Sequence, residues 1–211
     1  MKNRPSAENR KVRLRVVGEP ALPPQRQPYR ERRPREYLTD EEVDKLIAAA
    51  KKRGRYGHRD ATMILIAYRH GLRVSELIAL TWEQVDSRQE RLHVRRVKSG
   101  DPSVHPLRGI ELRALRRLRR ENAEGHHVFV SERRGPLTSD AARKRVAAAG
   151  EASGLGFPVH PHMLRHACGY KLANDGQDTR SLQLYLGHRN IQHTVRYTEL
   201  SASRFANFWR D

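Results

Sequence analysis

The sequence is poor in cysteine and in long apolar segments, and each shortage excludes a class of protein. Cys168 is the only cysteine among the 211 residues, so the chain can form neither an intramolecular disulfide nor a zinc site built from several cysteines. No apolar run is long enough to span a bilayer, and the basic N-terminus lacks the apolar stretch of a secretory signal. We therefore expect a cytoplasmic protein that makes no use of a membrane.

Acidic residues are also scarce relative to basic ones. The chain holds 42 Lys and Arg against 24 Asp and Glu, which gives a formal net charge of +18. Such a charge favours an anionic partner, because binding phosphates releases their counterions. Charge alone does not distinguish DNA from RNA, from an anionic membrane surface, or from an ordinary charged protein surface.

Residues 1–36 are rich in Arg and Pro and contain few large apolar side chains. A segment of this kind buries too little surface to offset the entropy lost on ordering. We predict a flexible basic arm, or equally an unstructured terminus without a role. A catalytic-domain-sized segment at 37–200 and a C-terminal tail at 201–211 complete the expected organisation.

Helical patterns dominate after the arm. Thr39 and Glu42 predict a capping box that begins a helix, which a Gly-rich break at 54–57 ends. Further helices are expected at 60–69, ended by Gly71, around 74–80, at 112–118, and at 137–150 with Thr138 or Ser139 as the cap. From Pro161 onward, helices follow one another with breaks at Gly176 and Gly187.

Strands are expected in three places. The alternation over 91–97 predicts a half-buried strand, and 104–107 its antiparallel partner after a turn at Ser99-Gly100-Asp101-Pro102. A short strand is expected at 128–130. The predicted fold class is therefore mainly α with a small antiparallel β-sheet (α+β).

Four short segments carry residues suited to chemistry: Gly71–Leu77 with Arg73 and Glu76, Val97–Gly100 with Lys98, His162–His166 with Arg165, and Leu186–Thr198 with His188 and Tyr197. Singly, each has a plain structural explanation. His162 and His166 are four residues apart, as in some metal sites, but no third ligand is evident, so we expect no metal and no cofactor.

In this order the segments resemble the tyrosine recombinase (phage integrase) family. Its pattern is Arg, an acidic residue, Lys, His-x-x-Arg, His or Trp, then Tyr, and every element is present: Arg73, Glu76, Lys98, His162, Arg165, His188 and Tyr197. The resemblance covers about residues 37 to 200. The stretch from Gly187 to Tyr197 looks especially like the short recombinases that invert the fimbrial phase switch.

The residue types suit strand cleavage at phosphorus. Arg73 and Arg165 could clamp the non-bridging oxygens, with His188 as a third donor. Glu76 lies one helical turn from Arg73 and could hold it, unless the two form a plain surface ion pair. Either arginine could instead be an ordinary contact to backbone phosphate.

The remaining roles concern protons. The Tyr197 phenol must lose its proton as it attacks, and His162 is the candidate base, with His166 as a structural histidine. A neighbouring arginine cluster should also favour phenolate. Lys98 is the candidate acid for the departing 5′ oxygen, since lysine releases a proton far more readily than arginine, although it could merely touch phosphate.

The resemblance implies a site-specific recombinase that forms a 3′-phosphotyrosine link and needs neither ATP nor metal. It implies double-stranded DNA carrying specific sites as partner, hence association with the nucleoid, and a homotetramer on two sites. Most members carry an N-terminal DNA-clamping domain, and we expect the arm before Thr39 to be too short and too polar to be one; the arm would lie in a DNA groove, or an accessory DNA-bending protein would help. The apolar tail, with Phe205, Phe208 and Trp209, would dock on a neighbouring protomer or fold back on its own core.

Three functions stay open on the sequence. The chain could be a recombinase that acts in inversion, integration or excision. It could be a non-enzymatic DNA-binding regulator on the same fold, or an enzyme like type IB topoisomerases that relaxes DNA alone. The intact residue set argues against the regulator, and the small size and the tail favour recombination over relaxation.

Overall fold

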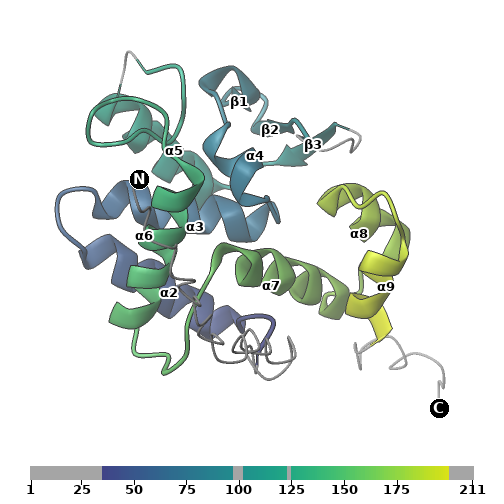
Figure 1. Ribbon diagram of the computed structural model, residues 1–211. Coiled ribbons are helices and arrows are strands. Elements are labelled where there is room, and N and C mark those ends of the chain that lie inside the picture. The colour runs from purple at the N-terminus through teal and green to yellow at the C-terminus, as the bar shows by residue number, and fades with distance from the viewer. Residues whose placement is uncertain (1–34, 97–101, 123–124, 200–211) are drawn as a thin grey trace, which may run out of the picture. The chain divides into compact units, whose positions relative to one another are not determined.

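The computed structural model describes residues 35–96, 102–122 and 125–199, and this part of the chain is mainly helical (Figure 1). In chain order its elements are α2 (Asp40–Lys52), α3 (Gly57–Arg69), α4 (Val74–Ile78), the 3-10 turn η1 (Trp82–Gln84), β1 (Val85–Asp86), β2 (Arg91–Val94), β3 (Ser103–Pro106), α5 (Gly109–Glu121), α6 (Ser139–Ala152), α7 (Pro161–Asn174), α8 (Thr179–Leu186) and α9 (Gln192–Glu199). The predicted fold class is confirmed.

The sheet is small and wholly antiparallel, with strand order β1-β2-β3. Leu92 of β2 pairs with His105 of β3, and Val94 pairs with Ser103, so the predicted hairpin is confirmed. Sequence analysis missed β1, which has only two residues. The strand predicted at 128–130 is wrong: Val130 forms an isolated bridge with Pro136, and the backbone of Val128 bonds to Leu80 instead.

The helix ends follow local chemistry. At the start of α2, Thr39 accepts from the Glu42 backbone N–H while the Glu42 carboxylate accepts from that of Thr39, so the predicted capping box is confirmed. Thr138 caps α6 by accepting from the Ala141 N–H. The α3 helix begins at Gly57, three residues before the prediction, where a Cβ would meet the Lys51 carbonyl oxygen at 2.3 Å.

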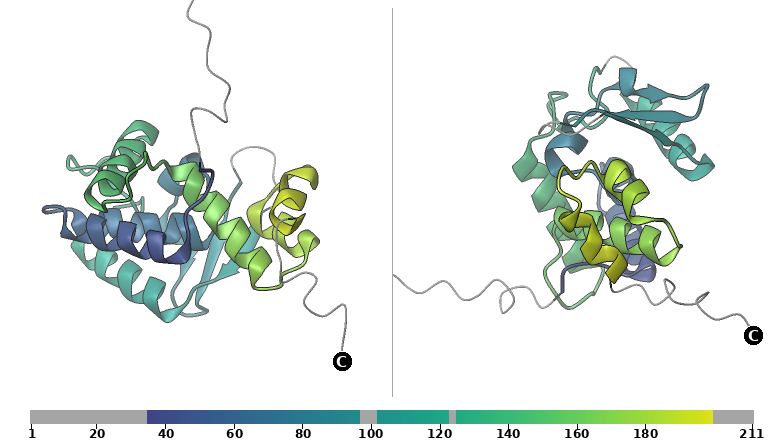
Figure 2. Two further views of the ribbon diagram at one scale, coloured as in Figure 1. Left: turned by 90° about the horizontal axis from the view of Figure 1, so that it is seen from below. Right: turned by 90° about the vertical axis from the view of Figure 1, so that its right-hand side faces the viewer.

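Two apolar clusters lie under these elements. The larger one is built from α2, α3, α5, α6 and the first half of α7, together with the buried face of the sheet. The smaller one joins the second half of α7 to α8 and α9. Both views of Figure 2 show α8 and α9 packed beside the end of α7. The C-terminal helices thus form a separate layer.

Glycines turn the chain where the sequence predicts. Gly71 follows α3 with φ +57 and Gly187 ends α8 with φ +66, both in the left-handed region that glycine favours. The two corners meet, because a Cβ on Gly71 would lie 2.4 Å from the Leu186 side chain. This contact brings the start of α4 to the end of α8.

Several expectations fall outside the described residues: the arm up to residue 34, Lys98 and the tail at 201–211. Residues 35 and 36 are described, and both make ion pairs, Arg35 with Glu42 and Glu36 with Arg196. Among the residues that the structure describes, no helix has both the length and the apolar character needed to cross a bilayer.

Candidate active site

Arg73 stands immediately before α4 and is held there by Glu76. The Glu76 carboxylate accepts from the Arg73 backbone N–H at 2.9 Å and from its guanidinium at 2.8 Å. The Glu76 side chain is buried, whereas 30% of the Arg73 side chain is exposed. The pair is therefore a half-buried clamp at a helix start rather than a plain surface ion pair, and it leaves one face of Arg73 open.

Arg165 lies inside α7 and is almost fully buried, with 1% of its surface exposed. Its guanidinium donates to the carbonyl oxygens of Gly71 at 2.5 Å and Leu186 at 2.7 Å. Arg73 in turn reaches the Gly187 carbonyl at 3.4 Å. Arg165 thus binds both glycine corners, and Arg73 binds the Gly187 corner as well. Burial lowers the pKa of Arg165 to about 10, and the nearby Arg73 acts in the same direction.

His188 follows the second corner directly. Its Nδ1 lies 2.9 Å from the Thr194 hydroxyl at the start of α9. Burial lowers the pKa of His188 to about 3, and the charges of Arg165 and Arg73 add to this effect. The imidazole is therefore neutral at pH 7, so any proton that it donates to a phosphate oxygen comes from the neutral ring.

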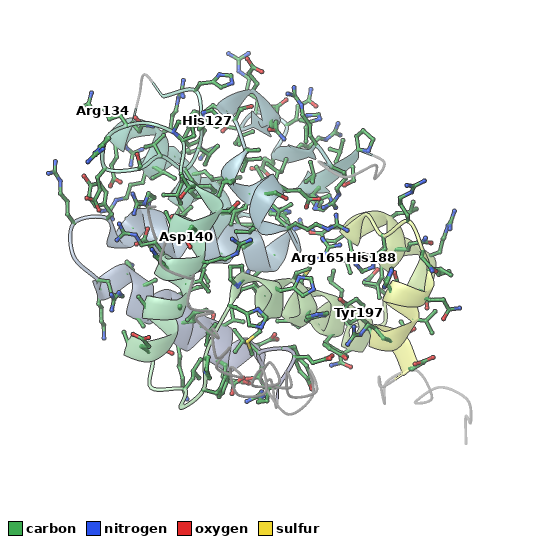
Figure 3. The ribbon with its side chains drawn as sticks, in the orientation of Figure 1. His127, Arg134, Asp140, Arg165, His188 and Tyr197 are labelled. Atoms are coloured by element: carbon green, nitrogen blue, oxygen red, sulfur yellow. The ribbon has the colours of Figure 1, made fainter. Side chains whose placement is uncertain are left out.

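Tyr197 on α9 completes the cluster. Only 2% of its surface is exposed. Its ring packs on Gly169 of α7 and lies edge-on to Tyr170, and the His188 ring stacks beside it with centroids 6.2 Å apart. Figure 3 shows Arg165, His188 and Tyr197 gathered along α7 and the C-terminal helices, well away from the labelled His127, Arg134 and Asp140.

Burial raises the pKa of Tyr197 to about 12, although Arg165 and Arg196 oppose the shift. Both arginines favour the phenolate, as expected from the sequence, but they do not lower the Tyr197 pKa overall in this conformation. Desolvation of the buried phenol exceeds their attraction. The hydroxyl is protonated in the structure as it stands.

A sequence model of the phage integrase family matches residues 36–204. The chain belongs to the phage integrase family. It is thus a tyrosine-type site-specific recombinase, and the regulator and topoisomerase functions are not favoured.

Relatives of known name agree with this membership. The chain is 46% identical to the type 1 fimbriae regulatory protein FimE of Escherichia coli K12 over 181 residues, which is 83% of this chain and 91% of FimE. FimB of the same strain is 39% identical, over 83% of this chain and 90% of FimB. Tyrosine recombinase XerD of Pseudomonas aeruginosa is 34% identical, over 79% of this chain and 58% of XerD.

Solved structures of other recombinases share the fold. The crystal structure of XerA recombinase superposes with a TM-score of 0.72 at 25% identity, over 83% of this chain and 65% of XerA. A lambda integrase dimer bound to a core site gives 0.63 at 24% identity, over 83% of this chain and 50% of the integrase chain. The second likeness is evidence of fold alone.

In this recombinase the Tyr197 hydroxyl is contacted by His166, which was expected to be a structural histidine. His166 Nδ1 lies 2.9 Å from the Tyr197 hydroxyl, and both side chains are buried. His162, the candidate base, is exposed one turn earlier and meets the His166 ring edge-on at 4.4 Å. Burial lowers the pKa of His166 to about 3, and the charge of His162 adds to this effect. His166 is therefore neutral and bonded to the phenol.

The structure describes all of the remaining candidate residues except Lys98. The structure brings Arg73, Glu76, Arg165, His188 and Tyr197 together, while Lys98 lies outside the described residues. Arg96, two positions before Lys98, was missed, although its guanidinium bonds to Glu76. The predicted strand alternation contained the signal, since Arg96 falls in phase with the buried Leu92 and Val94.

Proposed function

We propose that this recombinase cuts and rejoins double-stranded DNA through a 3′-phosphotyrosine at Tyr197. The observation that supports the proposal is the convergence of Tyr197 with Arg165 and His188 from α7, α9 and the Gly187 corner. Arginine forks and a neutral imidazole are suited to a pentavalent phosphorus whose non-bridging oxygens carry extra charge. Arg73, with its open face, would bind the same phosphate.

The proposed step balances without an added cofactor. The Tyr197 oxygen forms a bond to phosphorus as the bond to the 5′ oxygen breaks. The phenol proton passes to a base, for which His162 is our candidate because it is solvent-exposed at the site's edge. Lys98 gives the departing oxygen its proton. A 5′ hydroxyl from a partner strand then reverses the step, and the ester bond energy is retained.

DNA binding must open this site. Arg165 is 1% exposed and Tyr197 2%, so no phosphate can touch either group in the observed conformation. The covering layer is α8 and α9, which rest on the smaller apolar cluster. We infer that α9 changes position when DNA binds, and that the His166–Tyr197 hydrogen bond breaks as the Tyr197 side chain moves out of its buried site.

DNA inversion is the outcome that we propose. The support is the likeness to FimE and FimB, whose names describe regulators of type 1 fimbriae and of which the chain covers about nine-tenths. Inversion requires two sites and hence several protomers, so a tetramer on DNA, with the tail docked on a neighbour, belongs to the same proposal. An accessory DNA-bending protein belongs to the proposal as well.

The test begins by finding the DNA site. Protein is incubated with sheared genomic DNA from its source and denatured, and the DNA that stays attached is sequenced. Two copies of the recovered site are then placed in a supercoiled plasmid, inverted or direct. Inverted copies should invert and direct copies should excise, and Tyr197→Phe should do neither. Relaxed plasmid without rearrangement would contradict the proposal.

A further inference from the structure

Arg96 is a buried cation two residues after the end of β2, and its side chain is wholly enclosed. The guanidinium donates to three groups on three different elements. It bonds to Glu76 Oε2 of α4 at 3.0 Å, to the Ser103 hydroxyl of β3 at 3.4 Å, and at short range to the carbonyl of Tyr185 in α8. The sheet, the start of α4 and the end of α8 therefore meet at one side chain.

Each contact leads to a group proposed to hold the phosphate. Glu76 uses one carboxylate oxygen for Arg96 and the other for Arg73, so Arg96 fixes the plane in which Arg73 is held. Tyr185 directly precedes Leu186, whose carbonyl binds Arg165. A constraint on Arg96 thus reaches both arginines.

The corner before His188 also rests on Arg96. A Cβ added to Gly187 would lie 2.5 Å from Arg96 Nε, so the guanidinium lies directly against the glycine. The left-handed Gly187 sets where His188 begins. Arg96 therefore also limits how the Gly187–His188 corner can shift.

Stability alone explains this arrangement poorly. Arg96 and Arg73 share one carboxylate, and Arg96 Nε is buried with no hydrogen-bond partner among the described residues. Burial is the largest effect on its pKa, which it lowers. Taking a guanidinium out of water is unfavourable, and such buried pairs often add no net stability. A group buried at this cost is better explained by the geometry that it enforces.

We propose that Arg96 is a positioning residue of this recombinase. Through Glu76 it fixes Arg73, and by direct contact it fixes the Gly187–His188 corner, so that both are correctly placed around the scissile phosphate. The inference rests on the proposed phosphotyrosine chemistry. Arg96 acts on the transition state only through the groups that touch the non-bridging oxygens. Its loss should misplace those donors by fractions of an ångström, which is enough to slow phosphoryl transfer strongly.

The test compares two substrates at saturating protein. One is a nicked suicide duplex with an ordinary phosphodiester at the cleavage position. The other carries a methylphosphonate there, in which a methyl group replaces one non-bridging oxygen and removes its charge. Arg96→Met should slow Tyr197 adduct formation on the phosphodiester on the order of 10- to 100-fold. On the methylphosphonate the ratio of the wild-type rate to the Arg96→Met rate should fall towards one, because less negative charge develops on the non-bridging positions in the transition state.

Arg96→Lys keeps a charge but has one nitrogen, so it should lie between wild type and Arg96→Met. Arg95→Met is the matched control: Arg95 is the exposed residue directly before Arg96, and the single-turnover rate of this variant should stay at the wild-type value. An unfolded fraction lowers both substrate rates equally, so the ratio is insensitive to stability. Equal slowing on both substrates, or none, would overturn the proposal for Arg96. Absence of any adduct in wild type would instead reject the phosphotyrosine chemistry.

Discussion

The Tyr197 hydroxyl and His166 Nδ1 lie 2.9 Å apart, and both side chains are buried. Since burial raises the pKa of Tyr197 to about 12 and lowers that of His166 to about 3, both groups are neutral at pH 7. The Tyr197 phenol is thus protonated and away from solvent in this conformation. If Tyr197 is the nucleophile that we propose, opening of the C-terminal layer, rather than deprotonation alone, controls when it can react.

This hydrogen bond should be measurable in stability. We expect the coupling free energy between His166→Phe and Tyr197→Phe to be about 1 kcal/mol, the net worth of a buried neutral hydrogen bond. Urea unfolding of wild type, both single variants and the double variant measures it. Strictly additive losses would mean that the two side chains do not interact in solution.

Acid should destabilise the protein before its carboxylates titrate. Burial lowers the pKa of His105 to about 2 and those of His166 and His188 to about 3. In the unfolded chain the pKa of histidine is near 6.5, so between pH 6.5 and pH 3 the unfolded chain binds more protons than the folded protein. The stability is therefore full above about pH 6.5 and falls as the pH drops towards 3. The urea midpoint should decrease from pH 7 to pH 5, and less steeply in His166→Asn. A flat profile contradicts this.

Gly169 provides the space for the Tyr197 ring. A Cβ at this position would lie 2.8 Å from two carbons of the Tyr197 ring. Gly169→Ala should therefore cost about 1–3 kcal/mol of stability through overpacking, even though alanine is the better helix former. In a Tyr197→Ala background the same change should be neutral or stabilising. If the cost persisted there, Tyr197 would not occupy this seat.

Glu76 should contribute more to stability than an exposed carboxylate does, because its side chain is buried. Glu76→Gln leaves Arg73 and Arg96 without their shared carboxylate, so we expect a loss of about 3 kcal/mol in unfolding free energy. Glu121→Gln, which breaks an exposed pair with Arg117, should cost at most about 0.5 kcal/mol. Similar losses in the two variants would show that the Glu76 carboxylate is not a buried link.

The sequence was sufficient for the elements whose signals are local. The Thr39–Glu42 capping box, the breaks at Gly71 and Gly187 and the alternation around Leu92 all depend on neighbours in the chain. The prediction of a strand at 128–130 failed because strand pairing is not a local property. Val128 and Phe129 are buried in the core, but Val130 forms only an isolated bridge with Pro136. A buried apolar segment without a paired strand has the same sequence pattern as a strand.

The sequence predicted which residues make up the candidate site, but not which of them are buried. The order of the charged residues was enough to expect that Arg73, Arg165 and His188 meet. It assigned His162 as the base and His166 as a structural histidine, but it could not show that His166 contacts Tyr197, because that contact depends on the packing of α9 on α7. Burial of Tyr197 likewise depends on tertiary contacts across α7 to α9.

The central claim is a bond between the Tyr197 oxygen and phosphorus, and peptide mapping of the trapped adduct tests it most directly. Protein trapped on a nicked suicide duplex is digested with protease and nuclease and analysed by mass spectrometry. We predict that the peptide spanning Tyr197 carries a residual 3′-linked nucleotide on the tyrosine, and that Tyr197→Phe gives no adduct. An adduct on any other side chain, or sequence-specific binding with no adduct at all, would contradict the account.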